Sequence, residues 1–355
     1  MNSRTIQIIA GIFVSIILLS AGILGGAYYT GLIGDQNMSE EEPDNKSEVK
    51  VIEPNDYSTV SQDAINSVVS IYSESDGGLS SQGSGFMYKD NYIMTNHHVI
   101  ESADNVLIKY SNGEWTNATV IGSDVYTDIA VLEPDNIPDN VETLDMMETA
   151  LPERGVPVLA LGSPGDLGGT VTTGIISGTD RTMQTQTEFT VPDSVQTDAA
   201  LNPGNSGGPL ISAENGTVFG VNTATEGENL GFAVSSRLAN TIGESLIETG
   251  NHSHSYVGIR TLELTPLTES NYDVGVDSGL VVSEVVSESP NYGVLRGENT
   301  NETPDVIVSI EGKEIDTNQE MTSYLMRKTQ PGDTVEVGVY RNGTVQNIQI
   351  ELGSR

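Results

Sequence analysis

The segment Asp198-Ala199-Ala200-Leu201-Asn202-Pro203-Gly204-Asn205-Ser206-Gly207-Gly208-Pro209-Leu210 is the most informative part of this sequence. It places Ser206 in a glycine-rich turn that leads directly into an apolar run. A serine hydroxyl is a weak nucleophile at neutral pH and needs an adjacent general base. Glycines allow a backbone to turn tightly enough for several N–H groups to face one oxyanion. The alternative is an ordinary Gly/Asn/Pro turn before a strand, so a nucleophilic serine requires a histidine and a carboxylate elsewhere in the chain.

Four histidines are the candidates for that base. His97 and His98 follow the apolar run 92–95, and only one of two neighbours can face a cleft. The chemistry of the residues alone does not decide between them. His252 and His254 flank a short linker, where the ordinary expectation is a solvated side chain or a weak metal contact. The base is therefore expected at position 97 or 98.

A carboxylate on a different segment must hold the imidazole in one tautomer and stabilise its cation. Asp128 directly precedes the apolar run Ile129-Ala130-Val131-Leu132, which places it at the start of a strand beside the core. Asp135 and Asp139, by contrast, are expected on solvated faces. Any single Asp in so acidic a chain is ordinarily a surface charge, and Asp128 is the one whose context departs from that.

The composition narrows the class of protein. The 355 residues include 15 basic and 50 acidic side chains, for a net charge of −35, and no cysteine. Nucleic-acid binding needs basic patches and is excluded. The charge indicates either a cationic partner or adaptation to molar salt, where a Debye length of about 3 Å screens self-repulsion, and we favour the second. Without cysteine, and without Ca²⁺-loop or zinc spacing, the sequence predicts no disulfide, no metal site and no cofactor.

The N-terminal region is typical of a membrane anchor. Residues 6–29 are almost wholly apolar, and about 24 helical residues span roughly 36 Å, enough for a bilayer core of about 30 Å. A cleaved signal peptide is the alternative, but its apolar core is ordinarily shorter. With Arg4 on the cytoplasmic side, we predict a single transmembrane anchor at 1–33, an acidic disordered tether at 34–56, and an extracytoplasmic remainder.

Two folded regions are expected after the tether. Residues 57–250 contain many short β-rich runs separated by turn residues, typical of an all-β sandwich or barrel, with a break between two halves at 152–155. Apolar residues at helical spacing predict a closing helix at 236–248. Residues 251–355 form a smaller module of strands with one helix at 318–329, which turns Met321, Leu325 and Met326 inward.

Three blocks of the sequence resemble the catalytic blocks of HtrA/Deg serine proteases: Thr95-Asn96-x-His98-Val99, Thr127-Asp128-Ile129-Ala130-Val131 and residues 198–210. The resemblance covers roughly residues 57–352. It implies an all-β, chymotrypsin-like double β-barrel protease domain at 57–250 and a small α+β PDZ domain at 251–355. It also implies that His98 rather than His97 is the base, that Asp128 orients it, and that Ser206 is the nucleophile.

The same resemblance implies where substrate and peptide bind. The backbone N–H groups of Gly204, Asn205 and Ser206 match the oxyanion hole. Ala200 takes the position at the base of the S1 pocket, where no carboxylate is present to pair with Lys or Arg, so small to medium aliphatic residues are expected at P1. The other residues implied to line S1 are Leu201, Asn222, Thr223 and Ala224. The run Tyr256-Val257-Gly258-Ile259 is similar to the carboxylate-binding loop of the PDZ domains, which capture a C-terminal peptide as an added strand.

The function implied by the resemblance is hydrolysis of unfolded or damaged proteins by a membrane-anchored, extracytoplasmic endopeptidase, assembled as a homotrimer. Regulated cleavage of one membrane signalling substrate, and a catalytically silent chaperone or binding module, are the alternatives. The sequence departs from the family pattern at 180–192 and 289–305. Arg181 falls near the position that relays peptide binding to the oxyanion loop.

Overall fold

The computed structural model describes residues 54–355 apart from 77, 90, 102, 165–167, 186–189, 203, 224–229, 266–274 and 301–302. The predicted anchor and nearly all of the predicted tether lie outside the described residues. Within the described part of the chain, no helix is long and apolar enough to cross a membrane. The chain from residue 52 onward is grouped as one compact unit.

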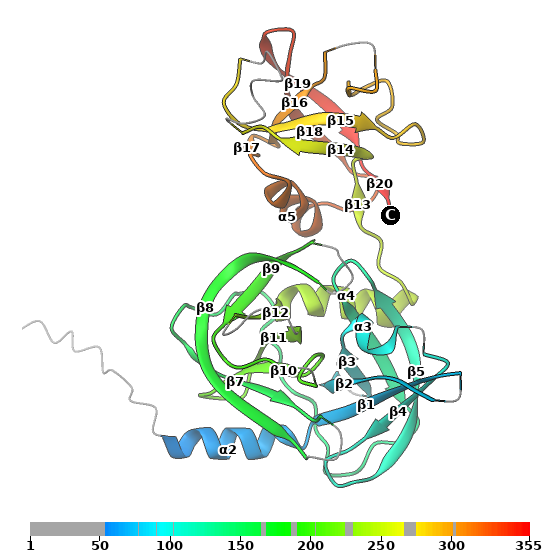
Figure 1. Ribbon diagram of the computed structural model, residues 1–355, viewed down its shortest axis with the longest axis vertical. Coiled ribbons are helices and arrows are strands. Elements are labelled where there is room, and N and C mark those ends of the chain that lie inside the picture. The colour runs from blue at the N-terminus through cyan, green and yellow to red at the C-terminus, as the bar shows by residue number, and fades with distance from the viewer. Residues whose placement is uncertain are drawn as a thin grey trace, which may run out of the picture. The chain divides into compact units, whose positions relative to one another are not determined.

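The first half of the all-β region is a closed barrel with strand order β1-β2-β3-β6-β5-β4, drawn in blue to cyan in Figure 1. Its elements are β1 (Val68–Ser75), β2 (Gly78–Tyr88), β3 (Tyr92–Thr95), the short helix α3 (His97–Ile100), β4 (Asn105–Lys109), β5 (Trp115–Asp124) and β6 (Ile129–Pro134). Side chains such as Ile71, Met87 and Leu132 fill its interior. Strand β6 is apolar and buried from Ile129 to Leu132, as its sequence predicts.

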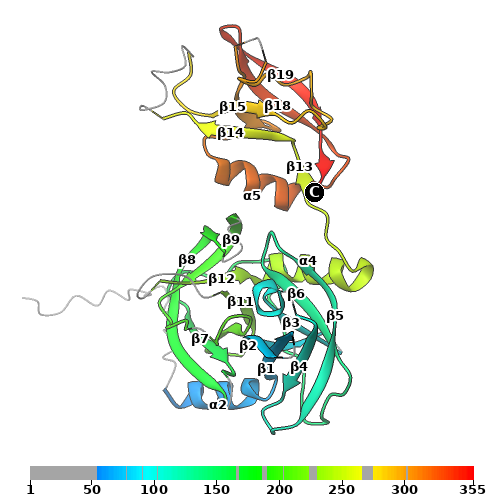
Figure 2. The same ribbon diagram turned by 45° about the vertical axis from the view of Figure 1, so that its right-hand side comes forward.

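The second half is another closed barrel, with strand order β10-β11-β12-β9-β8-β7, drawn in green in Figures 1 and 2. Its strands are β7 (Pro157–Gly162), β8 (Thr170–Gln184), β9 (Thr190–Thr197), β10 (Pro209–Ser212), β11 (Val218–Thr223) and β12 (Gly231–Ser235). The predicted break at 152–155 falls between β6 and β7, so each predicted half corresponds to one barrel. The chymotrypsin-like double-barrel architecture that the family resemblance implies is therefore confirmed.

The two barrels and one helix also contribute side chains to one common apolar cluster. Phe86 and Val131 of the first barrel, Leu161 of the second, and Leu238 and Ile242 of α4 (Ser236–Thr249) belong to the same buried cluster. The side chain of Ser235 caps the helix by accepting the N–H of Leu238. At the other end Gly250 takes a left-handed conformation, with φ of 77°. The shared core fixes the two barrels against each other.

The third part is the predicted α+β module, an antiparallel sheet with one helix. Its main sheet has the order β14-β15-β16-β18-β19, with β17 on β16, and β13 pairs separately with β20. The elements are β13 (Ser255–Tyr256), β14 (Ile259–Glu263), β15 (Leu280–Val285), β16 (Val306–Ile310), β17 (Lys313–Glu314), α5 (Asn318–Lys328), β18 (Thr334–Arg341), β19 (Thr344–Glu351) and β20 (Gly353–Ser354). A Thr317/Glu320 capping box starts α5. Leu325 is buried and Met321 packs against the same core.

Two elements differ from what the sequence predicts. Helix α2 (Pro54–Ile65) begins within the predicted tether, because its few apolar residues, among them Val60 and Ala64, pack on the shared core. A mostly polar helix held by a handful of contacts gives a weak periodic signal. Strand β8 runs for 15 residues to Gln184, longer than the short β-rich runs that the sequence predicts. Its second half is largely polar and is paired with β9.

Candidate active site

The loop that carries Ser206 is a compact, hydrogen-bonded turn. The N–H of Asn205 donates to the carbonyl of Asn202 at 2.9 Å, and the N–H of Gly208 donates to the carbonyl of Asn205 at 2.9 Å. The N–H of Gly207 donates to the carbonyl of Asn222 on β11 at 2.8 Å. These bonds fix the turn to the second barrel. Ser206 itself is only 5% exposed.

Gly207 brings this loop into contact with the first barrel. A Cβ atom built at Gly207 would lie 2.2 Å from the carbonyl oxygen of Ser84 and 2.2 Å from Oγ1 of Thr95. The φ of Gly207 is 82°, a conformation that disfavours other residues. The backbone N–H of Ser84 also donates to the carbonyl of Ser206 at 2.9 Å. The Ser206 loop therefore lies directly against the end of β3, the strand that leads to His98.

His98 is held by Asp128 at two points. The Asp128 Oδ2 atom lies 2.8 Å from Nδ1 of His98, and Oδ1 accepts the backbone N–H of the same residue at 3.0 Å. Asp128 is fully buried and has a φ of 60°. Its carbonyl accepts the N–H of His97 and Nδ2 of Asn96, at 3.1 and 2.9 Å. With Nδ1 facing the carboxylate, Nε2 is the ring nitrogen left to exchange a proton.

The structure separates the two neighbouring histidines that the residue types alone leave undecided. Nδ1 of His97 lies 3.0 Å from Oγ of Ser123 on β5, so this ring is turned toward the barrel wall. His98, not His97, contacts a buried carboxylate. The arrangement matches the assignment that the family resemblance implies.

The expected oxyanion donors are not equivalent in this structure. Gly204 has a φ of 105°, and its carbonyl accepts Oγ of Ser84, which in turn accepts the N–H of Ser163 at 2.7 Å. The N–H of Asn205 is engaged within the turn by the Asn202 carbonyl. The buried Asn205 Nδ2 atom has no hydrogen-bond partner among the described residues. In this geometry the Asn205 N–H faces the turn.

The residues implied to line S1 fall into two groups. Ala200 is exposed and Leu201 is half-buried. A Cβ at Gly231 would come within 2.9 Å of Leu201, so the leucine side chain covers β12 there. Asn222 and Thr223 are fully buried. Ala224 lies outside the described residues.

The side chains of Asn222 and Thr223 form internal hydrogen bonds in this structure. Nδ2 of Asn222 donates to the carbonyl of Pro209 at 3.0 Å, and Oγ1 of Thr223 accepts Nδ2 of Asn96 at 3.3 Å. The second bond links β11 directly to the residue two before His98. Asn96 and Ser84 are therefore supporting residues that the sequence alone does not reveal, although Asn96 stands within the Thr-Asn-x-His block.

The predicted carboxylate-binding loop borders a small cavity of about 80 Å³ beside α5. Its lining includes residues 255–259 together with Met321, Thr322, Leu325, Met326 and Arg355. The Val257 carbonyl accepts Oγ of Ser289 at 3.0 Å and Nδ2 of Asn291 at 2.8 Å. Because a trans peptide directs its C=O and N–H to opposite sides, the N–H of Gly258 points away from these two side chains. Ser289 and Asn291, from the segment that departs from the family pattern, thus set the orientation of this peptide group.

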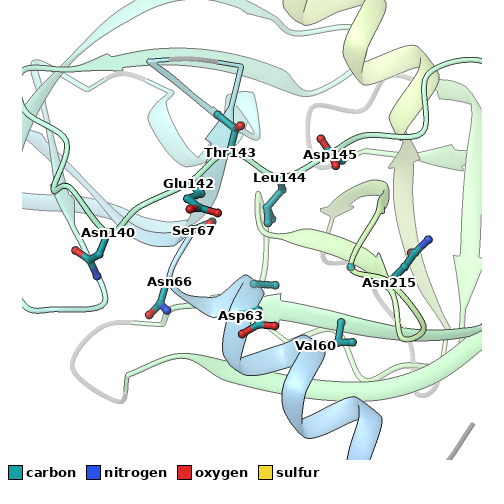
Figure 3. A pocket seen from close by; sticks show the side chains of 12 residues that line it. Val60, Asp63, Asn66, Ser67, Asn140, Glu142, Thr143, Leu144, Asp145 and Asn215 are labelled. Carbon is teal, nitrogen blue, oxygen red and sulfur yellow. The ribbon is translucent and has the colours of Figure 1, made fainter.

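A larger pocket of about 510 Å³ lies where α2 meets residues 140–145 and 215–216 (Figure 3). Asp63, Glu142 and Asp145 contribute carboxylates to it, and none of the predicted catalytic side chains lines it. Among the described residues there is no group of three or more acidic or histidine side chains that could hold a metal ion.

Arg181, the expected relay residue, lies on β8 opposite Ser194 of β9 and is exposed. Its neighbour Asp180 has a φ of 54° and accepts Nη1 of Arg327 from α5 at 3.0 Å. On the inner side of the same hairpin, Asp193 is buried and forms an ion pair with Arg237 of α4. The polar contacts at this hairpin therefore reach both α4 and α5.

Comparisons with known proteins agree with this architecture. Residues 83–221 match the family model of the trypsin-like peptidase domain, and residues 255–352 match that of the PDZ domain. The serine protease Do-like HtrA of Bacillus subtilis is 36% identical over 298 residues, covering 78% of this chain and 64% of that protein. The protein of the same name from Lactococcus lactis is 32% identical, with 94% of both chains covered. This chain thus spans less than two thirds of the Bacillus protein and nearly all of the Lactococcus protein.

Solved structures give the same result. The HtrA-type protease AlgW with a decapeptide superposes with a TM-score of 0.71 at 31% identity, covering 84% of this chain and 98% of that one. The serine endoprotease from Yersinia pestis superposes with a TM-score of 0.65 at 30% identity, with the same coverage. The sequence blocks, the double barrel and these matches agree, and the chain belongs to the HtrA family of trypsin-like serine proteases with one PDZ domain.

Proposed function

We propose that this chain is an active serine endopeptidase in which Ser206, His98 and Asp128 form the catalytic triad. The observation that carries the proposal is the pair of hydrogen bonds between Asp128 and His98, on a segment against which Gly207 packs the Ser206 loop. A buried carboxylate bonded to Nδ1 of a histidine is the arrangement that prepares Nε2 to act as a general base. None of the three residues is replaced, which argues against a catalytically silent module.

The reaction proceeds by transfer of an acyl group through the serine. Nε2 of His98 accepts the Ser206 hydroxyl proton as Oγ attacks the scissile carbonyl, and it returns that proton to the leaving amine. Asp128 stabilises the imidazolium without taking the proton. Water then hydrolyses the acyl-enzyme in a second, equivalent step. Backbone N–H groups at Gly204 and Ser206 stabilise the oxyanion, and loss of one such donor ordinarily lowers kcat about 10²–10³-fold.

We further propose that the substrates are unfolded or damaged proteins outside the cytoplasm. The apolar run at residues 6–29 supports a membrane anchor, and the net charge of −35 supports work at high salt. A relative from Halomonas elongata, 34% identical over 281 residues, is named as a probable periplasmic serine endoprotease. Ala200, which has no charge to offer Lys or Arg, supports cleavage after small to medium aliphatic residues. A homotrimer is proposed on the family resemblance alone.

A proteolysis assay tests the enzymatic part of this proposal. Casein is incubated in molar salt with the full chain or its Ser206→Ala variant, after both have been shown to fold by thermal unfolding. We expect hydrolysis by the first and none by the second. Equal hydrolysis by both would overturn the triad, and inactivity of both would favour a chaperone or binding module. P1 profiling that showed a preference for Arg or Lys would overturn the S1 assignment.

Two further measurements address the finer parts. Fractionation of cells that produce the full chain should place it with the membrane, and protease added outside intact cells should degrade it. If one membrane protein alone accumulates when Ser206 is replaced, while misfolded proteins do not, the regulated-protease alternative replaces quality control. Light scattering of the purified chain measures the number of subunits, and a monomer would contradict the trimer.

A further inference from the structure

His254 contradicts the sequence-based expectation of a solvated linker histidine. The residue is 3% exposed, and Nε2 lies 3.0 Å from both carboxylate oxygens of Asp124. Asp124 ends β5 and is itself 4% exposed. The linker between α4 and the PDZ sheet is therefore fixed to the protease barrel by a buried pair, which the proposed mechanism does not use.

Asp124 in turn holds the turn that leads to the predicted catalytic carboxylate. Its Oδ2 atom accepts the backbone N–H of Thr127 at 3.1 Å and also the Thr127 hydroxyl. Thr127 is fully buried and immediately precedes Asp128, whose φ of 60° is a left-handed conformation that few residues other than glycine, asparagine and aspartate adopt. The four-residue turn 125–128 is thus fixed at one end by Asp124 and at the other by the bonds between Asp128 and His98.

The backbone of His254 belongs to a different part of the molecule. Its N–H donates to the carbonyl of Arg355, and its carbonyl accepts the N–H of Arg355, both at 3.1 Å, which extends the β13-β20 ladder. Just before it, the linker passes close over β5, since a Cβ at Gly122 would lie 2.5 Å from the carbonyl of Gly250. One residue therefore joins the PDZ sheet through its main chain and the protease turn through its side chain.

The other groups that surround His254 are aromatic or cationic. The Tyr126 ring lies edge-on with ring centroids 5.2 Å apart, and the His252 ring lies at 4.6 Å. The Arg355 guanidinium lies over the Tyr126 ring, 4.6 Å from its centroid. Burial raises the pKa of the Asp124 carboxyl, but hydrogen bonds from His254 and Thr127, with the charges of both linker histidines, outweigh it and hold the pKa below its usual value. Asp124 is therefore the anion that this surrounding stabilises.

We propose that His254 is a positioning residue for the catalytic carboxylate. By binding Asp124, it holds the turn that presents Asp128 to His98. The geometry of that pair then depends on the position of the linker that precedes the PDZ domain. The inference rests on the proposed protease function. Removal of the imidazole leaves a buried carboxylate with one partner fewer, and such a group relaxes by displacing the turn it holds.

The length of the replacement side chain provides a matched test. The amide nitrogen of Gln occupies nearly the place of histidine Nε2, whereas that of Asn reaches only as far as Nδ1. We expect His254→Asn and His254→Ala to lower kcat about tenfold on a short peptide substrate, with KM within about twofold of the full chain's value. His254→Gln should keep kcat within about twofold. Ser253→Ala, an exposed position in the same linker, is the control and should leave kcat unchanged.

A second readout does not depend on turnover. In the Ser206→Ala background, proton NMR records the low-field resonance of the His98 Nδ1–H that faces Asp128. His254→Asn should shift or broaden this resonance, whereas His254→Gln and Ser253→Ala should preserve it. If the full chain proves inactive, the proposed function fails and this spectrum still decides the inference.

Equal kcat values and identical resonances in the Asn, Gln and unsubstituted proteins would overturn the proposal and leave His254 as a linker anchor only. Should the Asn and Ala variants fail to fold, Asp124→Asn gives the same test from the other partner. It should reproduce the loss of kcat and the altered resonance, and a normal kcat with a normal resonance would again overturn the inference.

Discussion

Asp128 binds His98 through both of its carboxylate oxygens, one bonded to the backbone N–H at 3.0 Å and the other to ring Nδ1 at 2.8 Å. The first bond fixes where the residue lies and the second fixes the rotation of its ring. Because Asp128 is fully buried, water does not compete for either contact. The tautomer of His98 is thus set by a single side chain.

Replacement of Asp128 by Asn should separate the control of the His98 tautomer from the positioning of the residue. The amide keeps the shape of the side chain but can donate to Nδ1, which moves the ring proton to Nε2 and removes the base. We expect kcat to fall about 10⁴-fold with little change in thermal unfolding. Ser123→Ala, which removes the partner of His97, is the control and should retain activity. An active Asp128→Asn enzyme would contradict the assignment.

Gly207→Ala should abolish activity by pushing the Ser206 loop away from β3. The added Cβ meets the Ser84 carbonyl and Thr95 Oγ1 at 2.2 Å, in addition to the cost of about 1–2 kcal/mol for a left-handed alanine. Gly216→Ala is the matched control, since its φ of 76° is similar and the nearest atom is 3.8 Å away. Casein hydrolysis and thermal unfolding of both variants measure the difference. Equal activity in the two would show that close packing at Gly207 is unimportant.

Asn291→Ala should weaken peptide binding by the PDZ domain without affecting basal proteolysis. Nδ2 of Asn291 bonds the carbonyls of Val257 and Glu351, each at 2.8 Å, so its loss frees the peptide group that orients the Gly258 N–H. We expect about tenfold weaker binding of a C-terminal peptide, measured by fluorescence anisotropy. Asn299→Ala is the control: it removes two hydrogen bonds to the backbone of Val285 on β15, and this variant should bind the peptide normally. Unchanged binding in Asn291→Ala would contradict this role for the loop.

His252 should reduce the stability of the protein in acid. Burial lowers its pKa, the charge of His254 lowers it further, and Asp124 opposes both. Its pKa in the folded state therefore lies below the unfolded value of about 6.5. As the pH falls through about 6.5, the unfolded chain takes up the proton first, and stability is lost until the folded pKa has been passed. Between pH 8 and pH 5, the unfolding temperature of His252→Asn should fall less than that of the unsubstituted protein; parallel curves would contradict the assignment.

How far the sequence predicts this molecule depends on how local each signal is. The alternating and apolar runs predict an all-β sandwich or barrel with a break at 152–155, and the family resemblance adds the double barrel. The helix predicted at 318–329 ends one residue from the observed end at Lys328. The long-range contacts are not visible in the same way. Asp124 and His254 are 130 residues apart, so no local pattern reveals that the histidine is buried, and the expectation of a solvated side chain was wrong.

In the candidate site, too, some residues are recognised from the local sequence and others only from tertiary contacts. Asp128 is identifiable because it directly precedes the apolar run of β6, and Ser206 because glycines surround it. The choice between His97 and His98 needs either the family resemblance or the tertiary contacts to Ser123 and Asp128. The supporting roles of Ser84 and Ser289 are not predicted, since each serine binds backbone groups of residues that are distant in the sequence.

The apolar core shared by both barrels and α4 has a consequence for kinetics. Packing of this kind does not let the barrels spread to admit a globular client, because opening them would expose side chains that are now almost completely buried. On the proposed function, the part of a client that reaches Ser206 is therefore a flexible or unfolded segment. Turnover should therefore follow the unfolding rate of the client. In a series of model clients with different unfolding rates, the fastest-unfolding client should be degraded first and the slowest last.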